Sequence, residues 1–394
     1  MEGRGMSLRE KSYALMPRLV QWRRHLHQYP ELSFHEVKTQ RYLIEQLSEM
    51  GLQPRVIGTT GVVVDIGTGP RGVAVRADID ALPLQEEAES VFKSRCDGVM
   101  HACGHDGHTA ILLGVAAVLA PQEATLPGRV RLMFQPAEEK LPGGAKLLIE
   151  EGVLDDVDRV LGLHLASDLP TGRVGIVVGP ATANADRFHI EVQGVGGHGS
   201  QPESSVDPIV VAAHLVLALQ TIVSRNMSPR HAAVLTVGTL NSGSNFNIIA
   251  PRAEMTGTVR TFDEQDRQTI RQRMQELVTQ LSSAHRAQGV LTYSEGYPRV
   301  VNTPLEADAA ERVIGRILGP DAVDHPDPLM AGEDFSYYLE KRPGVFLSLG
   351  CRNPAVGAMY PHHHPAFTLD EEALPIGVSV LATTALEFLT LNDR

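Results

Sequence analysis

Eight consecutive residues, His101 to His108, read HACGHDGH and contain three histidines, one cysteine and one aspartate. Imidazole, thiol and carboxylate groups at this density are typical of a metal site. So short a stretch supplies only part of the coordination that a metal centre needs. The rest of the chain must therefore fold so that distant residues of the same kinds reach this stretch.

The length and composition are those of a globular protein with more than one domain. A chain of 394 residues is longer than one hydrophobic core usually organises, and we expect two domains, one of them discontinuous. Hydrophobic residues make up 43% and charged residues 21%, which indicates a folded chain rather than a disordered one. The net charge of −12 repels phosphate backbones, so we expect no nucleic-acid partner.

The cysteine content indicates a reducing compartment. The chain has three cysteines, Cys96, Cys103 and Cys351, an odd and small number for its length. A disulfide framework is therefore not expected, and a cytoplasmic location fits. Cys103 would then be available as a thiolate ligand.

The apolar segments predict core helices rather than membrane spans. The first residues, MEGRGMSLREK, are charged and lack the apolar stretch of a signal peptide. Of the two most apolar runs, Ile111–Ala120 is shorter than the ~20 residues that cross a bilayer, and Ile209–Val223 carries His214 and Gln220. We expect both to be buried helices of a protein that does not associate with a membrane.

Several other segments have apolar residues at helical spacing. Such patterns cover residues 6–50 with a break at Tyr29-Pro30, then Thr109–Leu119, Ala145–Gly152, Pro304–Leu318 and a final amphipathic helix from Asp370.

Two β-branched runs, GVVVDIG from Gly61 and GVAVRADID from Gly72, predict two adjacent strands joined by a hairpin turn. The glycines between them match GxGxxG, but a dinucleotide-binding loop must open a helix, and here a strand follows. The second strand ends in Asp78 and Asp80, which alternation places on one side of the chain. They are either turn-capping aspartates or part of a site at the carboxyl end of the sheet.

Metal-capable side chains also follow two later strands. The run Arg129–Phe134 leads into QPAEE, so that Glu138 and Glu139 emerge just past a strand end, and Arg159–Leu165 carries His164 near its end. Each feature alone could be a solvated polar group. Together with Asp80, they predict an α/β domain whose strand ends converge on one site.

Residues 183–293 follow a different pattern. The order of predicted elements is β-α-β-β-α-β, which indicates a small ferredoxin-like domain inserted into the first. Its loop GVGGHGS also matches GxGxxG, but Pro202 and Pro208 interrupt the helix that should follow. His198 in this loop is either a turn residue or a catalytic donor presented by a lid.

Near the C-terminus, Pro361 and Pro365 flank three consecutive histidines. The prolines restrict the backbone and favour a rigid loop, which suits a metal ligand. The alternative is a solvated polar turn. From the residues alone, any of His362, His363 and His364 could be the ligand.

These residues predict a hydrolytic centre with two metal ions. Cys103, His105, Glu139, His164 and one histidine of the triplet are five ligands, more than one tetrahedral ion needs. A pair of divalent ions ~3.5–4 Å apart polarises a carbonyl and lowers the pKa of water. One member of the pair Glu138-Glu139 would remain unligated and act as general base. The chain contains neither GxSxG nor HExxH nor a Walker loop.

Motifs along nearly the whole chain resemble the amidohydrolase branch of the aminoacylase-type metallopeptidases, the family of hippurate hydrolases, N-acyl-amino-acid deacylases and auxin-conjugate hydrolases. In order, they are RRHLHQYPELSFHE, RADIDALPLQE, MHACGHDGHTA, FQPAEE, GLH, GVGGHGS, NIIAP, GTVRTF, GEDFSYYL and HHPAF. The resemblance implies an α/β fold, with a zinc-exopeptidase-like catalytic domain that has helices on both faces of a mixed sheet. This domain would comprise residues 1–182 and 294–394, and residues 183–293 would form an inserted ferredoxin-like α+β lid and dimerisation domain.

The resemblance also implies roles for individual residues. The implied metal ligands are Cys103, His105, Glu139, His164 and His363, and the implied catalytic and substrate-binding residues are Glu138 as base, Asp80 as the orienting carboxylate, and His198, Asn247 and Arg260 in the inserted domain. The implied activity is hydrolysis of an N-acyl amino acid, such as an N-acetyl or N-benzoyl derivative, by a homodimer or higher homo-oligomer.

Two alternatives to this function stay open. One is a dipeptidase or carboxypeptidase of the same superfamily, and the other is a metal-stabilised binding protein without catalysis. For the two divalent ions, cysteine and histidine favour zinc, whereas manganese, cobalt and nickel also suit a mixed ligand set.

Overall fold

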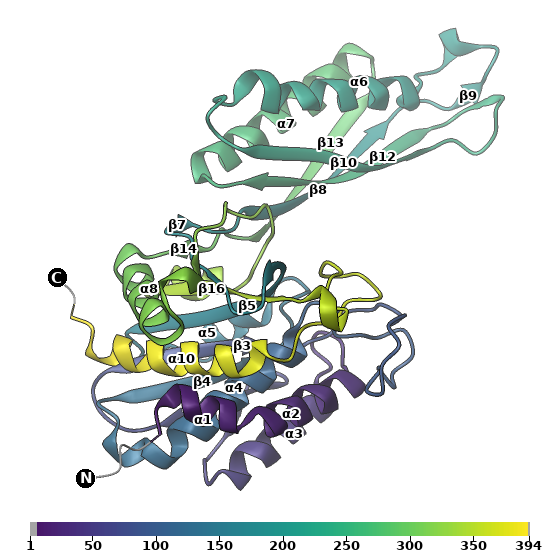
Figure 1. Ribbon diagram of the computed structural model, residues 1–394. Helices are drawn as coiled ribbons and strands as arrows, with labels where there is room; N and C mark the ends of the chain where they lie inside the picture. Colours follow the sequence, from purple (N-terminus) through teal and green to yellow (C-terminus); the bar gives the residue numbers. More distant parts are fainter. Residues whose placement is uncertain (1–5, 393–394) are drawn as a thin grey trace, which may run out of the picture. The chain divides into compact units, whose positions relative to one another are not determined.

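The computed structural model describes residues 6–392, so the first five letters of the chain and the last two lie outside the described residues. The chain divides into two compact units (Figure 1). Unit 1 comprises Met1–Ala181, Val300–Asp327 and Asp334–Arg394, and unit 2 comprises Thr182–Arg299 and Pro328–Glu333. The second boundary falls six residues after the expected one at 293/294, because the last strand of unit 2 runs on to Tyr297.

Unit 1 is built on a mixed eight-stranded sheet. In spatial order its strands are β1 (Arg55–Ile57), β2 (Gly61–Ile66), β4 (Arg129–Gln135), β3 (Gly72–Asp78), β5 (Arg159–Pro170), β16 (Gly344–Arg352), β6 (Val174–Gly175) and β15 (Val323–Asp324). Strands β4, β3, β5 and β16 are parallel neighbours, whereas β1 and β2 run antiparallel at one edge. The α/β fold expected from the sequence is confirmed.

The expected hairpin between Gly61 and Asp78 is wrong. Strand β4 lies between β2 and β3 and pairs with both, antiparallel to β2 and parallel to β3. The connection after β2 therefore crosses the end of β4. It packs closely there, since a Cβ on Gly67 would lie 2.5 Å from the backbone oxygen of Gly128.

Helices cover both faces of this sheet (Figure 1). They are α1 (Leu8–Ala14), α2 (Met16–Gln28), α3 (Val37–Glu49), α4 (His105–Leu119), α5 (Gly144–Glu150), α8 (Pro304–Leu318), α9 (Ser336–Leu339) and α10 (Ala373–Thr390). Alternating strand residues supply the two cores: Val73 and Val75 face the core with α4 and α10, and Ala74 faces the core with α5 and α9. Shorter elements are the 3-10 turns Ala120–Thr125, Pro320–Ala322 and Pro354–Val356, and the strand pair β7 (Gly179–Pro180) and β14 (Val301–Asn302).

The final helix differs from its prediction. Helix α10 is buried almost all round rather than amphipathic, because α1, α4 and α8 pack against it and cover the side that would otherwise face solvent.

Unit 2 is a four-stranded antiparallel sheet with two helices on one face. Its strand order is β10 (Ala233–Ser242), β12 (Arg252–Thr261), β8 (Asn184–Gln193) and β13 (Gln288–Tyr297), and its helices are α6 (Pro208–Thr221) and α7 (Glu264–Ala284). With the helices included, the chain order is β-α-β-β-α-β, with the first strand placed between the third and the fourth. Its smaller elements are the pair β9 (Gly197–His198) and β11 (Ile248–Ile249), a 3-10 turn Pro202–Ser204 and a π-helical turn Ile222–Asn226 that extends α6.

Within residues 6–392, two helices are long and apolar enough to cross a membrane by length and composition: α10, and α6 with its π-helical extension. Helix α10 is a core helix of unit 1. Helix α6 is buried on one side only, and Ile209, Val210 and Leu217 are exposed. The expectation of a buried helix is thus confirmed for the run that forms α4 and is wrong for the run that forms α6.

Candidate metal centre

Four separate segments of unit 1 deliver the predicted metal ligands to one place. Cys103 lies two residues before α4 and His105 begins that helix, Glu139 follows β4, His164 lies in β5, and His363 lies in the loop after β16. The convergence follows from the sheet: β4, β5 and β16 run in the same direction, so segments at their carboxyl ends meet at one edge.

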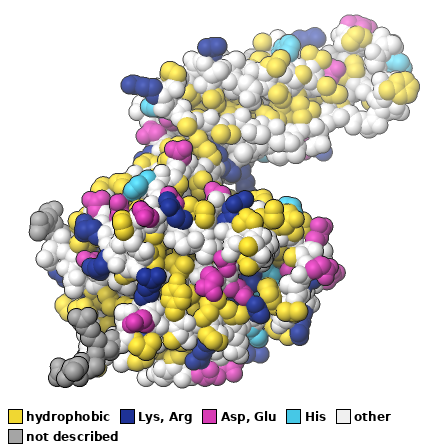
Figure 2. Space-filling view, in the orientation of Figure 1, with side chains coloured by type: hydrophobic (Ala, Val, Ile, Leu, Met, Phe, Trp, Pro, Cys, Tyr) yellow, Lys and Arg dark blue, Asp and Glu magenta, His cyan; other side chains and the backbone are white. Residues whose placement is uncertain are grey.

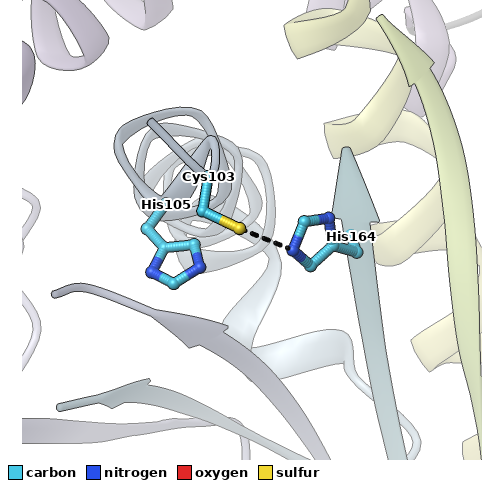
Figure 3. Close-up of side chains that lie close together, drawn as sticks. All are labelled: Cys103, His105 and His164. Atoms are coloured by element: carbon cyan, nitrogen blue, oxygen red, sulfur yellow. Dashed lines mark hydrogen bonds between the residues drawn. The ribbon is translucent and has the colours of Figure 1, made fainter. Parts of the chain in front are cut away.

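Cys103 is common to two groups of candidate ligands. One consists of Cys103, His105 and His164, and the other of Cys103, Glu139 and His363; within each, the ligand atoms lie within 4.8 Å of one another. Figure 3 shows the sulfur of Cys103 directed at His164, with Sγ 3.5 Å from Nε2, and His105 beside them. Glu139 Oε1 lies 3.3 Å from Nε2 of His363 and 4.0 Å from Nε2 of His105. This arrangement suits two ions that share the Cys103 thiolate.

The hydrogen bonding at the centre fits bound metal. Within residues 6–392, the buried atoms His105 Nε2 and Glu139 Oε1 have no partner in hydrogen-bonding geometry, and Glu139 Oε1 has only the contact with His363 Nε2 at 3.3 Å, although buried polar atoms in proteins are nearly always paired. His105 donates from Nδ1 to the backbone oxygen of Asp80 at 2.9 Å, which leaves the lone pair of Nε2 directed into the centre. This is the usual state of a metal-binding imidazole.

The shifted pKa values of Cys103 and His105 also indicate a site for cations. Burial raises the pKa of the Cys103 thiol well above its usual range, and the carboxylates of Glu139 and Glu138 raise it further. Burial alone would lower the pKa of His105, but Asp78 and Asp80 outweigh it and raise that pKa to about 10. Divalent cations would reverse both effects, because they favour the thiolate and the neutral imidazole.

The histidine triplet separates into three different environments. His363 has a left-handed backbone (φ 63°) and donates its N–H to the backbone oxygen of Ala102 at 2.8 Å, which ties it to the segment that carries Cys103. His364 Nδ1 accepts from the backbone N–H of Ala366, so this nitrogen is used. His362 lies deeper, with its ring 5.0 Å from that of His164, and burial lowers its pKa to about 4. Of the three, His363 belongs to a ligand group.

Within HACGHDGH, His108 and Asp106 serve other contacts. His108 uses both ring nitrogens, since Nδ1 donates to Asp78 at 2.6 Å and Nε2 accepts from the N–H of Leu165 at 2.8 Å. Asp106 accepts from Arg23 and His27, each at 2.8 Å. His101 is buried, and its Nδ1 has no hydrogen-bond partner.

Asp80 holds the backbone of the two glutamates of the centre through hydrogen bonds. Its carboxylate accepts from the backbone N–H groups of Glu138 (3.1 Å) and Glu139 (3.0 Å) and from the hydroxyl of Ser33 (2.7 Å). One aspartate therefore fixes the backbone of the adjacent glutamates and approaches His105, whose Nδ1 lies 3.3 Å from Oδ1. Glu138 itself is buried, and its carboxylate lies in a group with the carboxylate of Glu139 and the imidazole of His105.

Several supporting residues were not predicted as part of the site. Ser33 and His27 belong to the N-terminal motif RRHLHQYPELSFHE, to which no metal or substrate role was assigned, and Arg76 binds Asp78 and Asp334 at 2.7 Å each inside the sheet. The sequence feature that could have indicated such roles is the number of polar residues in the N-terminal motif, which also packs against the core.

The predicted residues of unit 2 lie in two places within that unit. The pairing of β9 with β11 sets His198 opposite Ile248, next to Asn247, whose backbone oxygen accepts from Gly199. Arg260 lies near the other end of the unit 2 sheet, where it pairs with Ala185 across β12 and β8. Its guanidinium donates to backbone oxygens, including those of Met330 and Asp186.

Known proteins of similar sequence and structure bear on this centre. The model of peptidase family M20/M25/M40 matches residues 74–387. An N-acetyl-L-cysteine deacetylase of Bacillus subtilis is 42% identical over 96% of this chain and 90% of its own length. A thermostable carboxypeptidase of Saccharolobus solfataricus is 39% identical over 94% of this chain and 95% of its own length.

A solved structure of a dinuclear metal-binding peptidase of the M20 family from Bacillus subtilis superposes with a TM-score of 0.83 at 37% identity, over 95% of this chain and 98% of that one. The ligand groups around Cys103 and this likeness both support a centre for divalent metal ions. The chain therefore belongs to peptidase family M20/M25/M40 and is a hydrolase of amide bonds.

Proposed function

We propose that the protein hydrolyses the amide bond of N-acyl amino acids and releases a carboxylic acid and a free amino acid. The observation that carries the proposal is the pair of ligand groups that share Cys103, with the buried carboxylate of Glu138 among their neighbours. The relative named as an N-acetyl-L-cysteine deacetylase supports the choice of an N-acyl amino acid.

In this proposal Cys103, His105, Glu139, His164 and His363 hold two divalent ions, with zinc first and manganese, cobalt or nickel as alternatives. When bound, the ions would polarise the amide carbonyl and lower the pKa of the attacking water. Glu138 takes the proton from that water and returns it to the nitrogen of the leaving amino acid. Asp80 holds the backbone of Glu138 and Glu139 and the ring of His105 in place for these steps.

The roles of the unit 2 residues rest on their motifs. We propose that His198 and Asn247 stabilise the oxyanion that forms on the amide carbonyl, and that Arg260 binds the free carboxylate of the substrate. Each role suits the donor groups of these side chains.

Unit 2 also carries the proposed homodimer contact. Hydrophobic side chains gather over α6 on the face shown in Figure 2, and Ile209, Val210 and Leu217 of this helix are exposed. An apolar face of this kind is typical of a contact between subunits. The unpaired thiols Cys96, Cys103 and Cys351 fit a cytoplasmic location.

The test of the base is Glu138→Gln, which keeps the shape of the side chain and removes its ability to take a proton. The variant should retain both metal ions, measured by elemental analysis, and lose turnover by roughly 10²–10⁴-fold. A variant that keeps full activity would show that Glu138 is not the base. A wild-type protein that holds its metal but turns over no amide would make it a binding protein.

A second candidate is a carboxypeptidase or dipeptidase, which the carboxypeptidase relative favours. A substrate panel decides between them: N-acetyl amino acids and N-benzoylglycine against dipeptides and longer peptides. Cleavage of the acyl amino acids alone supports the proposal, and cleavage of the peptides alone replaces it by the second candidate.

A further inference from the structure

Glu36 is a fully buried carboxylate close to the proposed base, and neither the metal nor the substrate roles above include it. Its side chain is 0% exposed. Oε2 accepts from the hydroxyl of Thr60 at 2.5 Å, and Oε1 accepts from the backbone N–H of Ala137 at 2.9 Å. Ala137 directly precedes Glu138 in the chain.

Helix capping does not explain this carboxylate. Glu36 occupies the N-cap position of α3, where a side chain normally accepts from the first backbone N–H groups of the helix, but Glu36 makes no such bond. Glu31 takes that role instead, since its Oε2 accepts from the N–H groups of Lys38 and Thr39. Burying a carboxylate costs free energy, and helix capping does not offset that cost here. The role of this buried carboxylate must therefore lie in its other bond, the one to the backbone N–H of Ala137.

The backbone of Ala137 provides one. Ala137 has φ 54°, a left-handed conformation that is unfavourable for a residue with a Cβ and persists only where the surroundings hold it. Its backbone oxygen accepts from the N–H of Gly144 at 3.0 Å, and its own N–H is bound by Glu36. This turn sets the direction in which the chain leaves β4 and enters Glu138.

Three successive backbone N–H groups thus point at two buried carboxylates. The N–H of Ala137 donates to Glu36, and those of Glu138 and Glu139 donate to Asp80. Successive N–H groups around a left-handed residue form a concave donor site for anions. Here the two carboxyl groups belong to the protein itself and hold the segment from both sides.

We propose that Glu36 is a positioning residue that fixes the left-handed turn at Ala137 and so aims Glu138 at the substrate, an inference that rests on the proposed function. It acts as an acceptor for the Ala137 N–H, not as a proton carrier or a metal ligand. A base displaced by about 1 Å can cost roughly 10²-fold in rate, so the effect should fall on kcat rather than on KM or metal binding.

The test compares Glu36→Ala, Glu36→Asp and Glu36→Gln in the metal-loaded enzyme. Alanine removes the acceptor and should lower kcat by about 100-fold with KM and metal content unchanged. The aspartate side chain is one methylene shorter, so its carboxyl lies farther from the Ala137 N–H, and this variant should also lower kcat. It provides the test if the alanine variant fails to fold. Glutamine keeps an acceptor oxygen and should stay within about threefold of wild type. The matched control is Glu306→Gln, a buried glutamate bound to Arg159 away from the metal ligands.

Hydrogen exchange separates this inference from the proposed function. In Glu36→Ala, the amides of residues 137–139 should exchange faster than in wild type, and Glu306→Gln should leave their exchange unchanged; this readout needs no substrate. Four results would each overturn the inference. Two concern Glu36→Ala and Glu36→Asp: a wild-type kcat, or a loss confined to KM or to metal content. The other two are unchanged exchange at residues 137–139 and a Glu36→Gln variant as impaired as Glu36→Ala. Inactivity of the wild type on every amide would overturn the proposed function and leave the exchange result to decide the role of Glu36.

Discussion

The metal centre of unit 1 and the Asp186 cluster of unit 2 are both buried polar networks, but only one of them is complete. Asp186 is 0% exposed and accepts four hydrogen bonds: two from Arg267, at 2.6 and 2.8 Å, one from the hydroxyl of Tyr293 at 2.7 Å and one from the N–H of Gly296 at 3.0 Å. In the metal centre, by contrast, His105 Nε2 and Glu139 Oε1 have no partner in hydrogen-bonding geometry among the described residues, and the nearest nitrogen to Glu139 Oε1 is His363 Nε2 at 3.3 Å.

The difference separates stability from function. A buried ionised group whose hydrogen bonds are all made has its desolvation cost offset within the protein, and its role ends there. A buried cluster with unpaired nitrogen and oxygen atoms that converge on one point costs stability unless something else binds them. In this comparison, incomplete hydrogen bonding belongs to the network whose residue types suit a metal ion, and complete hydrogen bonding belongs to the structural one.

The largest expected effect comes from removing the side chain that both ligand groups share. Cys103→Ala should reduce the metal content below two ions per chain and lower turnover by at least about 10³-fold, because metal polarisation of the carbonyl contributes several kcal/mol. Elemental analysis and a turnover assay measure the two effects. If the variant keeps two ions and full turnover, Cys103 is not the shared ligand.

Breaking the complete network should affect stability instead. Arg267→Met leaves Asp186 buried without its cation and should lower the free energy of unfolding by about 3–5 kcal/mol in urea titrations, with metal content unchanged. The control is Arg271→Met: Arg271 pairs with Glu295 where both side chains are more than 40% exposed, and its loss should cost about 1 kcal/mol or less. Equal losses from the two variants would contradict the comparison.

Glu36, like Asp186, is a buried carboxyl group with hydrogen-bond partners, and its contribution to the free energy of unfolding should depend on pH. Burial raises the pKa of its carboxyl from 4.5 to about 7. The folded state then binds a proton at this carboxyl more tightly than the unfolded state does. The protonated carboxyl therefore contributes to the free energy of unfolding; this contribution is fully present below pH 4.5 and is lost as the pH rises through 7. In the metal-free protein, the stability of wild type relative to Glu36→Gln should fall by about 3 kcal/mol between pH 4.5 and 8, at 1.36 kcal/mol per pKa unit. A difference that does not change with pH would show that the carboxyl titrates normally.

Residue type explains why the candidate ligands could be predicted and part of the fold could not. Cysteine, histidine and glutamate just past strand ends have few other uses at that density, and α8 was bounded correctly because Pro304 begins it and Gly319 follows it. The strand neighbours were predicted wrongly because a β-branched run predicts a strand but not its partner. Nothing in the run from Gly61 indicates that a segment some sixty-eight residues later, beginning at Arg129, pairs with it instead.

The positioning residues were missed for a related reason. Glu36 acts on the backbone of Ala137, and the left-handed conformation there has no sequence signal, since such positions usually hold glycine or asparagine. Ser33 likewise acts through Asp80, forty-seven residues away in the chain. Such contacts become visible only when the fold brings the segments together.

The smallest expected effect lies within the histidine triplet and tests the contrast over two adjacent residues. His363 Nε2 lies 3.3 Å from Glu139 Oε1, in a ligand group, whereas His364 Nδ1 accepts from the N–H of Ala366 and its ring stacks on Tyr360 at 4.6 Å. His364→Asn keeps an acceptor near Ala366, so it should change turnover by less than about threefold and stability by about 1 kcal/mol or less. His363→Asn should lower metal affinity by more than the 10–100-fold typical of losing a residue that only supports a ligand. Metal titrations of the two variants check this, and a larger loss in His364→Asn would mean that hydrogen bonding does not identify the ligand.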